Sequence, residues 1–257
     1  MSEPLNHQIA LVTGSSRGIG QAIALRLAQA GADIAIHYVR NESLAQETAR
    51  QIEALGRKAY LFRANLSKLE HIEQLFTGVK EHFGGLDIFI SSAASGFNRP
   101  AMQQKESGWD YTMDVNAKAF LFGVQQAVPL METRGGGRVI AISSQGSSRV
   151  LPDYIAVGAS KAALESLTRY LAVELAPKHI AVNAVSPGLV ETDALKHFAY
   201  MEDPTAIERA ASHTPAGRLV TPEDVAELVF FLCTPAAEMI RGQVIVIDGG
   251  FGLQVPA

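Results

Sequence analysis

Short apolar segments rich in Val and Ile recur along the whole of this chain, and stretches with helical spacing lie between them. The apolar segments are Ile9–Val12, Asp33–Val39, Ala59–Arg63, Leu86–Ser91, Arg138–Ser143, Ile180–Val185 and Gln243–Asp248. None of them alternates cleanly between apolar and polar residues, so each is predicted to be a strand covered on both faces, as in a parallel sheet. The alternation of strand and helix predicts an α/β fold: one doubly wound, Rossmann-type domain with a seven-stranded parallel sheet, right-handed crossovers and helices on both faces.

The stretches between the strands carry the start and stop signals of helices. Between 19 and 27 an Ile or Leu recurs every four residues, and Gly31 follows as a C-terminal stop. Thr221–Asp224 combines an N-cap threonine with a proline in the first turn. The longest stretch without a strand signal, 187–218, is expected to be a mobile flap over a site. We therefore predict a single domain over residues 1–257, with no linker that would divide it.

Composition and charge exclude several classes of protein. The 22 Lys and Arg and 26 Asp and Glu residues give a net charge of −4, which argues against a nucleic-acid-binding protein, since such proteins carry a basic face. No apolar run approaches the ~20 residues of a membrane span, and the segment 1–8 lacks the residue order of a secretion signal. Cys233 is the only cysteine, and no Cys and His cluster suggests a metal site. We expect a soluble, cytoplasmic protein without a metal, membrane or nucleic-acid partner.

A glycine-rich segment follows the first predicted strand and precedes a helix. Glycines there permit a tight turn, close approach of the backbone to a pyrophosphate and close packing of helix on strand, and the helix start offers free N–H groups to phosphates. The alternative is an ordinary tight turn, but the strand before it and the helix after it favour a dinucleotide site. The residues assigned to this site are Gly14, Ser15, Ser16, Arg17, Gly18, Ile19 and Gly20.

The end of the second predicted strand bears on the choice between NAD and NADP. An NAD site normally has Asp or Glu there to accept a hydrogen bond from the ribose 2′-hydroxyl, whereas residues 37–41 of this chain are His-Tyr-Val-Arg-Asn. A carboxylate would repel a 2′-phosphate, and Arg40, helped by Arg17, would pair with it. Arg40 could instead be an ordinary solvated charge, but the missing acid favours the first interpretation. We assign Tyr38 and Arg40 to the cofactor site and predict NADPH.

Motifs spread over nearly the whole chain resemble those of the short-chain dehydrogenase/reductase superfamily. They are Thr13–Gly20, Asn65–Leu66, Ser91–Ala94, Asn116, Ser143–Ser144, Ser160–Ala163 and Pro187–Gly188. The resemblance implies a nicotinamide cofactor. It assigns contacts to Asn65 and Leu66 at the adenine, to Ala93 and Ala94 along the cofactor, to Lys161 at the nicotinamide ribose, and to Pro187, Gly188 and Thr192 in a loop over the nicotinamide. This chain departs from the family where Ser91–Ala94 replaces Asn-Asn-Ala-Gly.

The catalytic motif departs further from the ordinary family pattern. Ordinary members have a catalytic Tyr four residues before the Lys, but that position is Val157, which has no proton to give or take. Tyr154 lies seven residues before Lys161. Seven steps of ~100° return to within about 20° of the same helix face, so the two residues can share a site. We predict that Tyr154 is catalytic, that the Lys161 cation lowers its pKa, and that Ser144, at the position of the family's catalytic serine, contacts either the substrate or its own loop.

The Tyr-x₆-Lys spacing resembles that of bacterial enoyl-[acyl-carrier-protein] reductases, and further segments look like the NADPH-dependent type III members. A conjugated enoyl thioester takes hydride at its β carbon, which displaces the developing oxyanion from the nicotinamide, and a donor placed about one turn farther out fits that need. The resemblance implies NADPH-dependent reduction of trans-2-enoyl-[acyl-carrier-protein] in fatty-acid elongation, by a homotetramer. Reduction of ketones, 3-ketoacyl thioesters or other enones, and a non-catalytic NADP-binding role, are the alternatives.

Side chains of the predicted flap bear on the substrate. Those that could line an acyl-chain channel, or pack there without any ligand, are Phe198, Tyr200, Met201 and Ile207. An acidic carrier protein needs a basic patch at the mouth of the channel. The candidates for this patch are Lys196, Arg209 and Arg218.

Overall fold

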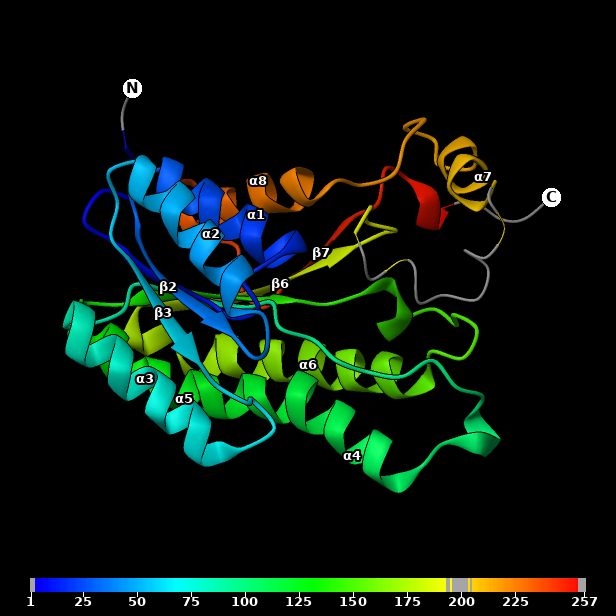
Figure 1. The fold of residues 1–257 in the computed structure, drawn as a ribbon, viewed down its shortest axis with the longest axis horizontal. Helices are drawn as coiled ribbons and strands as arrows, with labels where there is room; N and C mark the ends of the chain where they lie inside the picture. The colour runs from blue at the N-terminus through cyan, green and yellow to red at the C-terminus, as the bar shows by residue number, and fades with distance from the viewer. Residues whose placement is uncertain (1–2, 193–194, 196–202, 204, 254–257) are drawn as a thin grey trace.

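The computed structural model describes residues 3–192, 195, 203 and 205–253. They form a seven-stranded parallel sheet in the order β3-β2-β1-β4-β5-β6-β7, with helices on both faces (Figure 1). The strands are β1 (Ile9–Val12), β2 (Asp33–Tyr38), β3 (Ala59–Arg63), β4 (Ile88–Ser91), β5 (Gly137–Ile142), β6 (Ile180–Pro187) and β7 (Val244–Ile247). The helices are α1 (Gly18–Gln29), α2 (Glu42–Ala54), α3 (Leu69–Phe83), α4 (Glu106–Met113), α5 (Ala119–Glu132), α6 (Ile155–Glu174), α7 (Ala206–Ser212) and α8 (Pro222–Cys233). The predicted doubly wound α/β architecture is confirmed.

The seven predicted apolar segments are the seven strands, with small shifts at their ends. Strand β4 begins at Ile88 rather than Leu86, and β6 continues to Pro187 rather than ending at Val185. Strands β1, β4 and β6 are buried along their whole length, as the absence of an alternating pattern predicts. The prediction that every strand is covered on both faces is wrong for β3 and β7, which lie at the two edges of the sheet: Tyr60 is 40% exposed and Val246 is 56% exposed.

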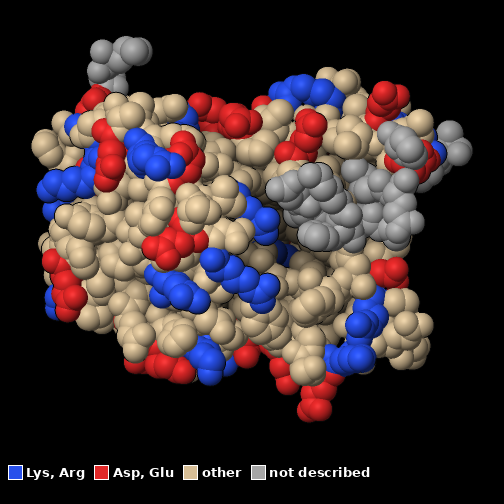
Figure 2. Space-filling model, in the orientation of Figure 1, with Lys and Arg blue, Asp and Glu red and all other residues tan. Residues whose placement is uncertain are grey.

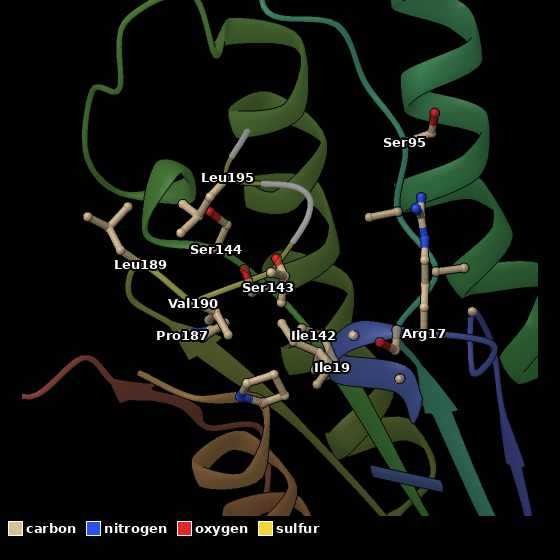
Figure 3. A pocket seen from close by; sticks show the side chains of 18 of the residues that line it. Arg17, Ile19, Ser95, Ile142, Ser143, Ser144, Pro187, Leu189, Val190 and Leu195 are labelled. Carbon is tan, nitrogen blue, oxygen red and sulfur yellow. The ribbon is translucent and has the colours of Figure 1, made fainter. Parts of the chain in front are cut away.

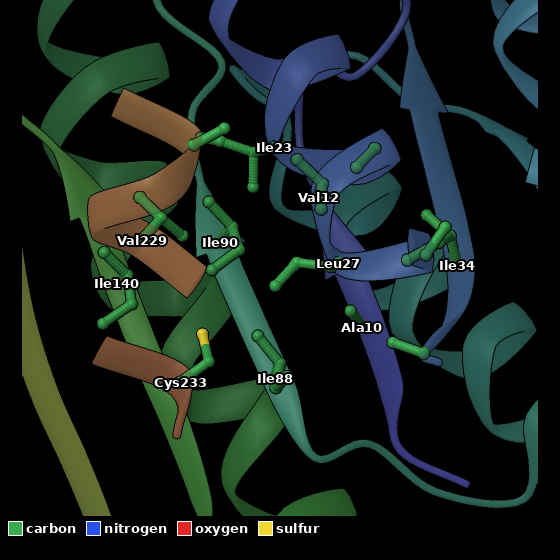
Figure 4. Close-up of a cluster of buried hydrophobic side chains, with 14 of the residues drawn as sticks. Ala10, Val12, Ile23, Leu27, Ile34, Ile88, Ile90, Ile140, Val229 and Cys233 are labelled. Atoms are coloured by element: carbon green, nitrogen blue, oxygen red, sulfur yellow. The ribbon is translucent and has the colours of Figure 1, made fainter. Parts of the chain in front are cut away.

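Two hydrophobic layers hold the helices against the sheet. On one face α1, α2 and α8 pack on the strands, and Leu27, Ile34 and Val229 of this layer have no exposed surface (Figure 4). On the other face α3, α5 and α6 pack on the sheet around Phe89 and Phe120. Burial of apolar surface on both faces stabilises the sheet by about 25 cal/mol per Å². The loops that follow the carboxyl ends of its strands form the site.

The predicted helix ends are confirmed at the positions that carry capping signals. Gly31 follows α1 with φ +105°, a left-handed conformation that favours glycine. Thr221 Oγ1 accepts the N–H of Asp224 at 3.2 Å, and the Asp224 carboxylate accepts the N–H of Thr221 at 2.9 Å, which forms a capping box. None of the helices within the described ranges is long and apolar enough to cross a membrane.

Strand β1 lies where the direction of winding reverses, with β2 and β3 on one side and β4 to β7 on the other. Val12 is in register with Ile36 of β2 and with Ile90 of β4. The loops that follow these three strands therefore meet at one edge of the sheet. A crevice at such a reversal, outside the carboxyl ends of the strands, is the usual ligand site of this architecture.

Candidate active site

A cleft of about 2260 Å³ lies over the carboxyl ends of the strands, and the loops after β1 to β6 form its walls. Figure 3 shows Arg17 and Ser95 on one side of it and Ser143 and Ser144 on the other. The predicted cofactor residues that line this cleft are Gly14, Ser16, Arg17, Gly18, Ile19, Gly20, Tyr38, Arg40, Asn65, Leu66, Ala93, Ala94, Lys161, Pro187, Gly188 and Thr192. The predicted catalytic residues Tyr154, Lys161 and Ser144 line the same cleft.

The glycine-rich turn has the shape that a dinucleotide pyrophosphate requires. Gly14 has φ +71°, and a Cβ there would lie 3.0 Å from the Cα of Ala93. A Cβ on Gly20 would collide with the carbonyl oxygen of Gly14. Helix α1 begins at Gly18 with neither a side-chain cap nor an acidic residue in its first turn, so its first N–H groups and the positive end of its dipole are available to phosphate. These residues fit a dinucleotide cofactor.

Ser15 belongs to the glycine-rich segment but does not line the cleft; it supports the turn from below, together with His37. Ser15 Oγ donates to the carbonyl of Val12 at 2.7 Å and accepts the N–H of His37 at 3.0 Å. The His37 ring accepts the N–H of Gly14 at Nδ1 at 3.0 Å, so Nε2 carries the proton and donates to the carbonyl of Ala64 at 3.0 Å. Burial lowers the pKa of His37 to about 4. This role was not predicted, although a histidine inside an apolar strand is a signal for it.

Basic side chains gather at the end of the cleft next to β2. Arg17 and Arg40 both line it, and Figure 2 shows Lys and Arg side chains at the rim of the hollow in this face. Of the described lining residues, Glu191 is the only one with a carboxylate, and it belongs to the loop after β6. A 2′-phosphate at the end of β2 would therefore meet cations and no lining acid.

Tyr154 is the N-cap residue of α6, and its ring lies against the backbone of Gly146. Its hydroxyl donates to Ser144 Oγ at 3.4 Å, and the same oxygen accepts the N–H of Gly146 at 3.3 Å. Ser144 thus makes a hydrogen bond within its own loop and also contacts the tyrosine. Burial raises the pKa of Tyr154, and the hydrogen bond with Ser144 opposes that shift. The Tyr154 hydroxyl is therefore protonated at neutral pH and able to donate.

Lys161 is buried, and its Nζ donates to the carbonyl of Ile142 at 2.6 Å. Burial lowers the pKa of Lys161 to about 8, and the nearby Glu165 carboxylate opposes this shift. The prediction that Lys161 lowers the pKa of Tyr154 is wrong for this arrangement, because burial raises that pKa and Ser144 is the group that counteracts it. The lysine amine is held by the end of β5, while the tyrosine hydroxyl pairs with the loop that follows it.

Val157 does not line the cleft. It is 7% exposed and packs against Gly96, where a Cβ would collide with Cγ2 of Val157. That same Cβ would lie 3.5 Å from Cγ2 of Thr112. At the sequence position where ordinary short-chain dehydrogenases/reductases have the catalytic tyrosine, this chain therefore has a valine that packs α6 against the segment after β4.

The described part of the predicted flap forms one wall of the cleft. Ile207, predicted for an acyl-chain channel, lines this wall together with Leu195 and His213. The other three channel candidates lie outside the described residues: Phe198, Tyr200 and Met201.

The candidates for a basic patch are not all available to a partner. Arg209 pairs with Asp203 at 2.8 Å, and Arg218 pairs with Asp224 at 2.5 Å. Arg209 also lines the cleft, whereas Arg218 does not. Lys196 lies outside the described residues.

Comparisons with known proteins identify the family of this chain. The family model described as Enoyl-(Acyl carrier protein) reductase matches residues 14–252. The 1-cyclohexenylcarbonyl-CoA reductase of Streptomyces collinus is 38% identical over 249 residues, which cover 97% of this chain and 88% of that protein. The chain belongs to the short-chain dehydrogenase/reductase superfamily.

Two solved structures of similar proteins contain nicotinamide cofactors. A short chain dehydrogenase from Burkholderia cenocepacia J2315 in complex with NADP has a TM-score of 0.89 and 35% identity, and the match covers 97% of this chain and 99% of that one. A 7α-hydroxysteroid dehydrogenase complexed with NADH and 7-oxo glycochenodeoxycholic acid has a TM-score of 0.91 and 30% identity, over 97% and 96% of the two chains. This member of the superfamily is therefore an oxidoreductase, a reductase that uses a nicotinamide cofactor. Its described residues contain no group of three or more His, Cys, Asp or Glu that could hold a metal ion.

Proposed function

We propose that this protein reduces the C2=C3 double bond of trans-2-enoyl thioesters carried by acyl carrier protein, with NADPH as its cofactor. The placement of Tyr154 carries the proposal: its hydroxyl lines the cleft beside Ser144, while Val157 packs outside the lining. The matching family model and the Streptomyces relative are both named after reductases of unsaturated acyl thioesters, which supports this substrate class over ketones.

The reaction needs one hydride and one proton. When bound, the reduced nicotinamide supplies the hydride that adds to the β carbon of the conjugated thioester. Negative charge then develops on the thioester oxygen, and the Tyr154 hydroxyl, kept protonated by burial, is the donor that stabilises it. Ser144 orients that hydroxyl through the 3.4 Å hydrogen bond. Lys161 would hold the ribose of the bound cofactor, and the α carbon takes its proton from Tyr154 or from water.

The choice of NADPH and the assembly into a homotetramer belong to the same proposal. Arg17 and Arg40 support NADPH, because both line the cleft at the end where no acid lines it.

Exposed apolar side chains support assembly into a homotetramer: Tyr170 and Val173 on α6 are 75% and 79% exposed, and Val246 lies on the edge strand β7. Light scattering coupled to gel filtration should give the mass of four chains.

Steady-state oxidation of NADPH tests the function. Purified protein should reduce crotonyl-[acyl-carrier-protein] in preference to the corresponding 3-ketoacyl thioester. Tyr154→Phe should lower kcat/KM by about 100-fold or more, because it removes the proton donor, and should leave the affinity for NADPH unchanged. Tyr60→Phe is the matched control, since this exposed tyrosine lies on β3 and does not line the cleft. Full activity of Tyr154→Phe, or preference for ketoacyl substrates, would refute the assignment; tight NADPH binding with no turnover would favour the non-catalytic alternative.

A further inference from the structure

Glu165 lies one turn after Lys161 on α6 and reaches the connection between β5 and α6. One oxygen of its carboxylate, Oε1, accepts hydrogen bonds from Ser143 Oγ at 2.5 Å and from Ser147 Oγ at 2.6 Å. In both hydrogen bonds a hydroxyl donates to a carboxylate, and both bonds are partly buried. Hydrogen bonds to a carboxylate are stronger than those between neutral groups. The carboxylate therefore fastens both ends of the turn 143–147 to the helix.

That turn carries the immediate surroundings of the Tyr154 hydroxyl. Ser144, between the two fastened serines, is the residue to which Tyr154 donates at 3.4 Å. Gly146, also between them, is the backbone surface against which the Tyr154 ring lies. Movement of the turn would change both the direction of the phenol and its hydrogen bond. A proton donor must be held in a fixed position relative to its substrate, and neighbouring residues supply that constraint.

The same carboxylate acts on Lys161 by its charge. Burial lowers the pKa of Lys161, and Glu165 is the charged group that opposes this shift. The Ile142 carbonyl at the end of β5 accepts from Lys161. The one ionisable side chain of β5, Arg138, pairs with Glu238, and β6 has no ionisable side chain. The other ionisable groups on described elements packed against α6 lie at its two ends and on α4. They are Tyr154 at its start, Glu106, Asp110 and Tyr111 on α4, Asp114 and Lys118 of the neighbouring π-helical turn, which pair with each other at 3.0 Å, and Lys178 of the turn Ala176–Lys178, which pairs with Glu132 at 2.8 Å.

We propose that Glu165 is a positioning residue of this active site, whose carboxylate fixes the turn 143–147 beneath Tyr154 and supplies the negative charge beside the Lys161 ammonium. The first role rests on the proposed function of Tyr154 as proton donor. The second concerns the cofactor side of the cleft and does not depend on which substrate is reduced. The two roles reside in one group, but they can be separated because one needs hydrogen-bond acceptance and the other needs charge.

Two variants separate them. Glu165→Gln retains an oxygen that accepts from both serines but removes the charge. The alkaline limbs of kcat/KM and of NADPH affinity should both move to lower pH by about one unit, since Lys161 then loses its proton earlier. The double variant Ser143→Ala with Ser147→Ala retains the charge but removes both donors. It should lower kcat about tenfold, with no movement of the alkaline limb. Glu174→Gln, an exposed acid near the end of the same helix, is the control for loss of charge.

NADPH affinity, followed by nicotinamide fluorescence between pH 6 and 10, keeps this test independent of the substrate. If the wild-type protein reduces no enoyl thioester, the proposed function fails, and the fluorescence titration of Glu165→Gln still decides the charge role. Circular dichroism and thermal unfolding confirm that each variant is folded, and Ser147→Ala alone replaces the double variant if that one is not. An unchanged alkaline limb in Glu165→Gln overturns the charge role, and wild-type kcat in the serine variant overturns the positioning role.

Discussion

Acidification from well above pH 6.5 to well below pH 4 should cost this protein about 3 kcal/mol of folding stability through a single residue, His37. The ring is fully buried beneath the glycine-rich turn, and both of its nitrogens are engaged. Nδ1 accepts the N–H of Gly14, so a proton on Nδ1 would face another donor. Burial accordingly lowers the pKa of His37 from 6.5 in the unfolded chain to about 4 in the folded one. The difference of about 2.5 in pKa corresponds to about 3 kcal/mol, since each pKa unit corresponds to about 1.4 kcal/mol.

The sign follows from which state binds the proton first. The unfolded chain takes up the proton near pH 6.5, whereas the folded protein resists it until about pH 4. The contribution of His37 to stability is therefore complete above pH 6.5, declines as the pH falls, and is lost below pH 4. Over that interval the free energy of unfolding should fall by up to about 1.4 kcal/mol for each pH unit from this residue alone.

Urea unfolding, followed by circular dichroism at several pH values between 7 and 4.5, measures this slope. His37→Asn is the informative variant, because its amide oxygen can accept the Gly14 N–H without titrating. The free energy of unfolding of this variant should fall less than that of the wild-type protein between pH 6.5 and 4.5, by about 2 to 3 kcal/mol. His82→Asn, at an exposed position on α3, should leave the slope unchanged. Equal slopes for the wild type and His37→Asn would show that His37 is not held neutral by the fold.

Two further predictions concern the cofactor and the tyrosine. Arg40→Ala should raise the Kd for NADPH about tenfold, as expected for the loss of one phosphate contact, and change the Kd for NADH less than twofold; equal losses for both would exclude contact with the 2′-phosphate. Gly146→Ala should lower kcat at least tenfold, because the new Cβ would lie 2.5 Å from Cδ1 of the Tyr154 ring and displace it. Gly108→Ala is its control, since a Cβ there would have ordinary contact at 3.6 Å with Phe97. A Gly146→Ala variant with wild-type kcat would show that the position of the ring is unimportant.

Local sequence patterns predicted the order and approximate limits of the strands because each strand is a short apolar segment, and β1, β4 and β6 are buried along their whole length. The glycine-rich turn was predictable for a similar reason, since glycine adopts the φ of +71° found at Gly14 without the steric cost that other residues meet there. That Tyr154 and Lys161 line the same cleft was predictable from their seven-residue spacing, but their hydrogen bonds to Ser144 and Ile142 were not. All of the predictable features follow from neighbours along the chain.

The sequence by itself therefore determined the fold class, the position of a dinucleotide turn and the unusual spacing of the tyrosine and lysine. Only the tertiary structure decided that His37 supports Gly14 and that Glu165 fastens the turn 143–147. It also decided that the pKa of Tyr154 is raised rather than lowered. The physical reason is that hydrogen bonds act over a short range and tolerate displacements of only a few tenths of an ångström. The distances between segments far apart in the chain, and the burial that shifts a pKa, are set by the packing of the whole sheet and its helices.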